Sequence, residues 1–289
     1  MTARSTDIGR QISVTSSAVV AVAAAVIGSG AWGGTPISEA ADGALAADAT
    51  YVAPGGTAFT IWSLLYAGFL AFAVWQILPA QRENPRLRAT SWLIALSLLL
   101  NAAWIATVQV GWVTVSVAVI VALLVTLAAV FIRCLRSRPA DVTEAVLLDG
   151  VMGLYLGWIV VATVANTAAA LNQATADFGL GAQPWAVIVV AGAAVVGAAL
   201  SVIGRGRVAA PAAIVWGLAW IAIARLDAPQ STAVAVAAAA AALVVVSAAV
   251  TARIRRPNTP TPALGEAHLE ARVWKKSAQR RLGPSRTSR

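Results

Sequence analysis

The chain has 289 residues, of which 59% are hydrophobic and only 11% are charged, and its mean hydropathy is +0.78. Soluble domains carry about a quarter charged residues, so this composition excludes an ordinary soluble domain and indicates a polytopic membrane protein. The net charge of +9 does not indicate a nucleic-acid partner, because residues 253–289 hold ten Lys and Arg against two Glu and leave +1 for the rest of the chain.

Eight segments are long and apolar enough to cross a bilayer as helices. In chain order, the predicted spans cover residues 12–32, 57–80, 89–109, 112–133, 145–170, 184–203, 208–225 and 230–252. The predicted fold is therefore an all-α, polytopic membrane helix bundle of about eight transmembrane helices.

The connections between the predicted spans alternate in charge. Arginines precede the first span and follow the second, fourth, sixth and eighth spans. By contrast, the connection 33–56 carries three acidic residues and no base, and the connection 171–183 carries a single acid. Because positively charged connections stay in the cytoplasm, this pattern places both termini on the cytoplasmic side.

The first span could alternatively be a cleaved signal peptide, since two arginines precede it and small residues follow near positions 38–40. Cleavage would leave seven spans and an N-terminus outside. Its roughly 20 apolar residues exceed the about 7 to 15 of a signal h-region, which favours a retained span.

Cysteine and histidine are too scarce for several kinds of site. Cys134 is the only cysteine, and His268, the only histidine, lies in the basic tail. Disulfides, multi-ligand Cys/His metal sites and His-dependent triads are therefore excluded. Asp149, near the start of the fifth span, is interpreted as an interfacial carboxylate close to the cytoplasmic surface rather than as part of a proton relay.

Ten of the eleven tryptophans fall into two groups by predicted depth, and Trp274 lies in the basic tail. Those at the span ends fit the aromatic belt of the membrane–water interface. The others lie inside spans, where an indole N–H needs an acceptor unless it faces a pocket. This second group consists of Trp62, Trp104, Trp158, Trp216 and Trp220.

Three predicted helices place aromatic and amide side chains at one depth, in the outer half of the bundle. A spacing of three or four residues puts those of each span on one helical face. They are Phe59, Trp62 and Tyr66 on the second span, Asn101 and Trp104 on the third, and Tyr155, Trp158, Ala162 and Asn166 on the fifth. A buried polar group in lipid costs free energy unless it is hydrogen-bonded, so Asn166 and Trp158 are expected to face other helices or a bound molecule.

Two interpretations of these residues remain open. An aromatic-walled cavity with a few polar groups, opening toward the outer loops, would accept a flat hydrophobic ligand. The same residues could instead only join the helices, through hydrogen bonds between amides or from amides to carbonyl groups.

The residues at this depth also resemble a known family. Three groups of residues are similar in order and spacing to the second, third and fifth helices of that family. They are Pro54-Gly55 with Phe59, Trp62 and Tyr66, Leu100-Asn101 with Trp104, and Tyr155-Leu156-Gly157-Trp158 with Ala162, Asn166 and Leu171-Asn172. The family is that of the tryptophan-rich sensory proteins (TspO/MBR), the bacterial relatives of the mitochondrial translocator protein. The resemblance covers residues 12–173. It implies a TspO-like five-helix bundle over residues 1–173, to which residues 184–252 add three helices and residues 253–289 a basic cytoplasmic tail.

The resemblance also implies a function, the binding of porphyrins or other hydrophobic ligands. By resemblance, the pocket would be lined by Trp62, Tyr66, Asn101, Trp104, Trp158 and Asn166. Family members usually carry a Trp-Tyr pair in the first outer loop that is associated with porphyrin breakdown, whereas here Trp32 and Tyr51 are well separated. We therefore expect a binding protein rather than an enzyme, with no required cofactor. No tyrosine is followed by a basic residue within five positions, so the short sterol-binding pattern is absent.

The primary hypothesis is a plasma-membrane receptor or carrier for a porphyrin-like ligand. A secondary transporter or facilitator of a small neutral metabolite, or a membrane assembly or scaffold protein, are the alternatives. The three additional helices are expected to replace a homodimer surface or to add a wall to the cavity. Besides the bilayer and the ligand, the expected partners are anionic lipid head groups at the tail. Residues 264–282 of the tail could form a basic amphipathic helix on the inner leaflet, or the tail could be disordered.

Overall fold

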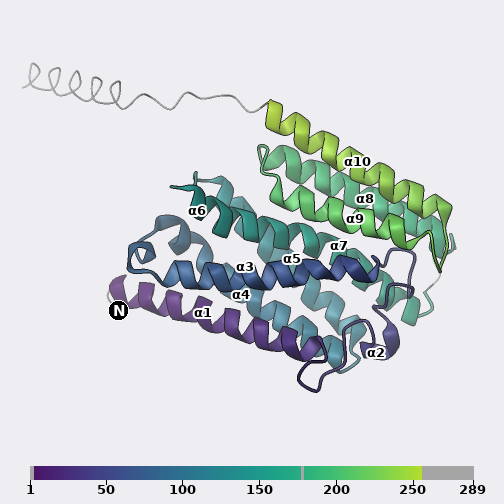
Figure 1. Ribbon diagram of the computed structural model, residues 1–289, viewed down its shortest axis with the longest axis horizontal. Helices are drawn as coiled ribbons and strands as arrows, with labels where there is room; N and C mark the ends of the chain where they lie inside the picture. Colours follow the sequence, from purple (N-terminus) through teal and green to yellow (C-terminus); the bar gives the residue numbers. More distant parts are fainter. Residues whose placement is uncertain (1–2, 177–178, 256–289) are drawn as a thin grey trace, which may run out of the picture. The chain divides into compact units, whose positions relative to one another are not determined.

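The computed structural model describes residues 3–176 and 179–255, and every regular element in these ranges is helical (Figure 1). The prediction of an all-α, polytopic helix bundle is confirmed. Residues Met1–Ile254 form one compact unit. The helix predicted over residues 264–282 of the basic tail lies outside the described residues.

Each predicted span forms a helix. The long helices are α1 (Ala3–Gly28), α3 (Ile61–Ile77), α4 (Pro85–Gln109), α5 (Val113–Leu135), α7 (Val151–Gln173), α8 (Ala182–Ile203), α9 (Ala209–Ala224) and α10 (Thr232–Ile254). The short elements are α2 (Ala40–Gly43), η1 (Gly56–Thr60), η2 (Pro79–Gln81), α6 (Val142–Glu144) and η3 (Ala145–Gly150), a π-helical turn that continues directly into α7.

Seven helical segments of the described chain are long and apolar enough to cross a membrane. The remaining predicted span, residues 208–225, forms α9, which has only 16 residues. At 1.5 Å per residue α9 is about 24 Å long, shorter than the roughly 30 Å hydrocarbon core of a bilayer. It still lies side by side with α8 and α10 (Figure 1). The prediction of eight spans is therefore correct for seven full-length segments, and the eighth is a shorter apolar helix.

The first helix begins earlier than predicted and includes charged residues. The sequence predicts a span over residues 12–32, whereas α1 already begins at Ala3. Asp7 and Arg10 are consequently buried in the helix. Asp7 forms an ion pair with Arg88, and the guanidinium of Arg10 donates a hydrogen bond to the carbonyl of Arg82 (2.8 Å). Buried charged groups are tolerated when they are paired or hydrogen-bonded in this way. The helix can therefore begin before the apolar stretch and include these two residues.

Helix α7 joins the first long helices to the last three. It packs against α3 and α5 and also against α9. Two glycines permit the close approach to α9: a Cβ at Gly153 would lie 2.8 Å from that of Ala209, and one at Gly157 would meet the carbonyl of Ala210. Small residues of this kind let membrane helices pack closely. The predicted division into residues 1–173 and 184–252 falls just after α7 and stays a prediction.

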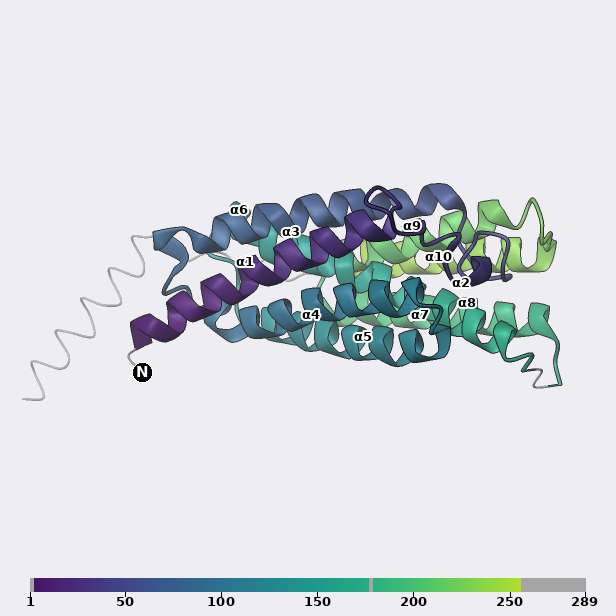
Figure 2. The same ribbon diagram turned by 90° about the horizontal axis from the view of Figure 1, so that it is seen from below.

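The connection between α1 and α3 folds over the end of the bundle that the loop charges assign to the outside (Figure 2). This connection, residues 29–60, is called the outer segment below. Ala41 and Asp42 adopt the left-handed backbone conformation (φ 52° and 57°), which turns the chain sharply. Ala41 and Leu45 pack against buried residues at the start of α5 and the end of α7. The outer segment therefore covers the helix ends next to the predicted site.

Candidate functional site

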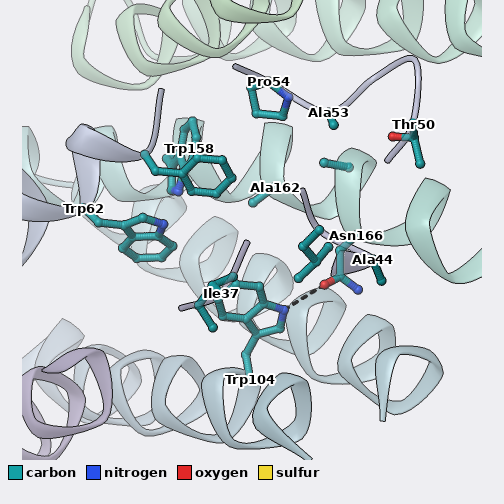
Figure 3. Close-up of a pocket in the computed structure, with 13 residues that line it drawn as sticks. Ile37, Ala44, Thr50, Ala53, Pro54, Trp62, Trp104, Trp158, Ala162 and Asn166 are labelled. Atoms are coloured by element: carbon teal, nitrogen blue, oxygen red, sulfur yellow. Dashed lines mark hydrogen bonds between the residues drawn. The ribbon is translucent and has the colours of Figure 1, made fainter. Parts of the chain in front are cut away.

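A small cavity lies under the outer segment, at the outer ends of α3, α4 and α7 (Figure 3). Its lining residues are Ile37, Ala44, Leu45, Thr50, Ala53, Pro54, Phe59, Trp62, Trp104, Trp158, Ala162, Ala165 and Asn166. None of them is charged. The cavity volume is about 30 Å³, far below the about 300–1,000 Å³ of pockets for drug-sized ligands. The cavity is therefore too small for such a ligand in this structure.

Trp62 is the centre of an aromatic cluster that forms one wall of the cavity. Its ring stacks with that of Trp104, with centroids 6.3 Å apart and planes at 20°. It meets Trp158 edge-on, at 6.2 Å and 88°. Phe59 makes a second edge contact with Trp158, at 5.9 Å and 82°. Offset-stacked and edge-to-face pairs contribute about 0.5–1.5 kcal/mol each beyond the burial of their area, so the cluster holds α3, α4 and α7 together.

Asn166 connects α7 to both α4 and α5. Its Oδ1 accepts a hydrogen bond from Trp104 Nε1 (2.9 Å), which is drawn as a dashed line in Figure 3. Its Nδ2 donates to Ser116 Oγ (2.9 Å), and the Ser116 hydroxyl donates to the carbonyl of Val113 (2.7 Å). Of the two expectations for this buried amide, that it faces other helices or a bound molecule, the hydrogen bonds agree with the first.

Three of the nine predicted site residues do not line the cavity. Tyr66 Oη donates to Asn101 Oδ1 (3.0 Å), and Tyr155 Oη donates to the carbonyl of Ser97 (3.3 Å). These bonds join α3 to α4 and α7 to α4, as the helix-joining interpretation expects. The structure brings the other six together around the cavity: Phe59, Trp62, Trp104, Trp158, Ala162 and Asn166.

Two buried N–H donors in this region lack a hydrogen-bond acceptor among the described residues. Trp158 is 1% exposed and Asn101 is 0% exposed, and neither Trp158 Nε1 nor Asn101 Nδ2 has a partner. A buried polar group without a partner costs about 1–3 kcal/mol. Trp158 lines the cavity and Asn101 does not. Trp158 thus combines an unpaired indole N–H with a place in the cavity lining.

Apart from Phe59, the lining residues that the outer segment provides were not predicted from the sequence. These residues are Ile37, Ala44, Leu45, Thr50, Ala53 and Pro54. Two features of the sequence could have indicated these residues. Pro54 belongs to the motif Pro54-Gly55, and several of the others are apolar residues within an acidic connection. An irregular segment has no period, however, so its sequence does not indicate which side chains turn inward. Ala165 on α7, three residues after Ala162, was also missed.

Helix α9 holds the outer segment without lining the cavity. The backbone N–H of Gly55 donates to the carbonyl of Trp220 (3.2 Å). The indole of Trp216 donates to the carbonyl of Ala58 (3.0 Å). No residue of α8, α9 or α10 is among the lining residues. Of the two expectations for the additional helices, an added wall of the cavity is wrong, because the outer segment takes that place and α9 supports the segment. The replacement of a homodimer surface stays a prediction.

Arg225, directly after α9, makes the strongest contacts of this support. Its guanidinium is 1% exposed and donates to the carbonyls of Ala47 (2.7 Å) and Thr50 (2.6 Å). Burial lowers the pKa of this guanidinium, and the nearby Tyr51 and Asp48 act in the opposite direction. Because both carbonyls belong to the outer segment, one side chain fixes the stretch that precedes Pro54.

The two aromatic residues of the first outer loop lie outside the cavity lining. Trp32 is 74% exposed, and Tyr51 packs against the hydrophobic cluster shared by α8, α9 and α10. The cavity therefore contains no counterpart of the Trp-Tyr pair that the family resemblance associates with porphyrin breakdown.

The family assignment rests on a comparison of the whole chain. A family model described as TSPO-like protein matches residues 12–251. The match extends beyond residue 173, where the resemblance described above ends, and it includes α8, α9 and most of α10. Comparisons with curated proteins and with solved structures found no match. The matched residues form most of the chain and include every residue that lines the cavity, so the chain belongs to the TSPO-like protein family.

Proposed function

We propose that this protein is a plasma-membrane receptor or carrier that binds a flat, porphyrin-like ligand in the outer cavity, and that it is not an enzyme. The observation that carries the proposal is the Trp158 indole, whose N–H lacks an acceptor although the side chain lines a cavity walled by Trp62, Trp104 and Phe59. Aromatic walls favour a flat conjugated ligand, and an unpaired donor favours one with an acceptor atom. Membership of the TSPO-like family supports a receptor or transporter type of membrane protein.

The volume of the cavity requires the outer segment to move when such a ligand binds. Pockets for drug-sized ligands have volumes of about 300–1,000 Å³, whereas this cavity measures about 30 Å³. The aromatic wall is fixed by three packed helices, but the opposite side consists of the irregular residues 37–54. We therefore expect the ligand to displace residues 37–54 of the outer segment and to leave the aromatic wall, which includes Phe59 of η1, in place.

The absence of charge from the lining restricts how a porphyrin could be oriented. Every lining residue is uncharged, and Thr50 and Asn166 have the most polar side chains. Carboxylates buried there would lack a cation, which costs several kcal/mol. The macrocycle would therefore enter with its apolar edge first and keep its carboxylates toward the outer surface.

Quenching of tryptophan fluorescence by protoporphyrin IX in detergent tests the proposal. We expect saturable quenching by the wild-type protein. Trp158→Phe removes the unpaired donor and keeps an aromatic ring, so it should weaken binding roughly 3- to 10-fold, the equivalent of one hydrogen bond. Trp62→Phe should also weaken binding, since it reduces the area of the central ring.

Trp92→Phe is the matched control, because Trp92 is 51% exposed on α4 and does not line the cavity. It should lower the total fluorescence and leave the dissociation constant unchanged. Quenching that rises linearly with porphyrin concentration, or that weakens equally in all three variants, would show partition into the micelle and would refute the proposal.

A facilitator of a small neutral metabolite is the second candidate function. The small volume and the uncharged lining of the closed cavity favour it, because a small solute would need less movement of the outer segment. Such a protein would give no saturable quenching by protoporphyrin. Proteoliposomes that contain it would instead swell faster in glycerol than protein-free liposomes, as measured by light scattering.

A further inference from the structure

A second concave site lies at the opposite, cytoplasmic end of the bundle. It is an open groove of about 410 Å³ between the start of α4 and the end of α5. Four arginines line it, Arg86 and Arg88 from α4 and Arg133 and Arg136 from the end of α5, and no acidic residue of the described ranges does. The groove is therefore strongly basic and distinct from the aromatic cavity.

Two of these arginines are neutralised by carboxylates. Arg86 is buried, and its Nη2 lies 2.7 Å from Asp149 Oδ1 while its Nη1 lies 3.3 Å from Glu144 Oε1. Arg88 Nε donates to Asp7 Oδ1 (2.9 Å). The interpretation of Asp149 as a carboxylate near the cytoplasmic surface agrees with this position, and its ion pair shows what the carboxylate does there. Arg86 and Arg88 thus line the groove as members of ion pairs and do not supply its excess charge.

The other two arginines supply that excess charge. Arg133 and Arg136 are exposed, and neither forms an ion pair with a carboxylate of the described residues. Arg133 Nη1 donates to the carbonyl of Ala89 (2.6 Å), which holds its guanidinium over the first turn of α4. Two unneutralised cations beside a groove without acids favour an anion there.

The backbone N–H groups at the N-terminus of α4 contribute little to anion binding by themselves. Pro85 has no N–H, and the side chain of Asn84 already accepts the backbone N–H groups of Arg86 (2.9 Å) and Leu87 (3.2 Å). An anion in the groove would therefore be bound by the guanidinium groups. Guanidinium is planar with several donors, a geometry that matches phosphate oxygens.

The surface next to the groove indicates what kind of phosphate compound fits. On α4, Trp92, Leu96 and Leu99 are exposed and follow Ala89 at helical spacing. On α5, Val125 and Ile132 are exposed on the face that ends at Arg133 and Arg136. These helices run side by side (Figure 2). Exposed apolar side chains thus follow the basic groove along both helices.

We propose that this groove binds the phosphate group of an anionic phospholipid of the inner leaflet, whose acyl chains lie along the exposed faces of α4 and α5. The groove is at the depth at which the predicted orientation places the cytoplasmic head groups. Basic pockets between transmembrane helices on the cytoplasmic side are suited to anionic head groups. A soluble phosphate compound would use the arginines but leave the apolar surface unused.

Native mass spectrometry of the full chain in detergent, titrated with phosphatidylglycerol or phosphatidylcholine, tests the proposal. We expect the wild-type protein to retain phosphatidylglycerol in preference to phosphatidylcholine. The double variant Arg133→Gln/Arg136→Gln keeps the structural pairs of Arg86 and Arg88. Because each surface arginine strengthens binding of an anionic lipid about 5-fold, the double variant should bind phosphatidylglycerol on the order of 10- to 30-fold more weakly.

Arg253→Gln is the matched control, since Arg253 is an exposed arginine in the last turn of α10 and lies outside the groove. The basic tail is present in all proteins, so its contribution cancels. Equal weakening in the control, or equal retention of the two lipids by the wild type, would overturn the proposal. Release of the bound lipid by millimolar inorganic phosphate would also overturn it, because the site would then recognise a free anion. Unchanged circular dichroism and unchanged porphyrin quenching would show that the double variant is folded.

Discussion

The hydrogen bonds of Asn166 should make a measurable contribution to the stability of the bundle, and Asn166→Leu tests this. Leucine resembles asparagine in shape, so the change removes the amide with little change in packing. Two interhelical hydrogen bonds are lost, those with Trp104 Nε1 and Ser116 Oγ. Such bonds contribute about 0.6 kcal/mol on average and up to about 1.7 kcal/mol in membranes, and Trp104 is left with an unpaired buried N–H. We expect the free energy of unfolding to fall by about 2–3 kcal/mol in total.

A double-mutant cycle with Trp104→Phe identifies the source of this loss. In the wild type, Trp104→Phe breaks the bond to Asn166, whereas in the Asn166→Leu background it removes a donor that already lacks a partner. Trp104→Phe should therefore cost about 0.5–1.5 kcal/mol less in the second background. Unfolding in mixed micelles containing SDS, followed by circular dichroism, measures all four proteins. Additivity within about 0.3–0.5 kcal/mol would refute the reasoning, and the pair Asn166→Leu with Trp92→Phe is the control that should be additive.

Two further substitutions test the contacts of α9. Arg225→Ala removes both hydrogen bonds from the guanidinium to the outer segment, so the amides of residues 44–58 should exchange hydrogen roughly 10- to 100-fold faster by mass spectrometry, while Arg225→Lys should show a smaller increase. An unchanged exchange rate would mean that other contacts hold the segment. Gly157→Ala places a Cβ against the carbonyl of Ala210 and should lower the free energy of unfolding by about 1–3 kcal/mol. Gly192→Ala, on α8 with open space around it, should not lower it, and an equal loss in both variants would contradict the proposed close contact.

The sequence predicted the aromatic wall of the cavity because helical periodicity and the charges of the loops together assign a face and a depth to each residue of a span. The spacing of Trp62, Trp104 and Trp158 within their spans assigns each to a helical face, and the alternating loop charges assign each span a direction and hence a depth. The remaining unknown is the rotation of each helix about its axis. A polar residue inside lipid limits that rotation, since the amide of Asn166 must turn toward other helices.

The same rules could not show which polar residues satisfy one another. Tyr66 and Asn101 lie at the predicted depth, but they bond to each other below the cavity. Whether two side chains meet or leave room for a ligand depends on distances of a few ångströms, which helical periodicity does not determine. Arg225 is a similar case. It lies next to an outer connection, where the positive-inside rule disfavours a base, and only its two carbonyl partners in the outer segment explain its position.

The contacts that close the cavity also determine what could open it. The bonds from Arg225 to the carbonyls of Ala47 and Thr50 can be exchanged for bonds to water as the outer segment lifts. The apolar contacts of Ile37 and Leu45 with the core that contains Trp104 and Trp158 have no such replacement, because water does not compensate exposed apolar surface. A flat apolar ligand does compensate it, since its face takes the place of these side chains against the aromatic wall. Such a ligand would bind the open form better than the closed form, and this difference in affinity is the condition for a ligand to shift the equilibrium between them.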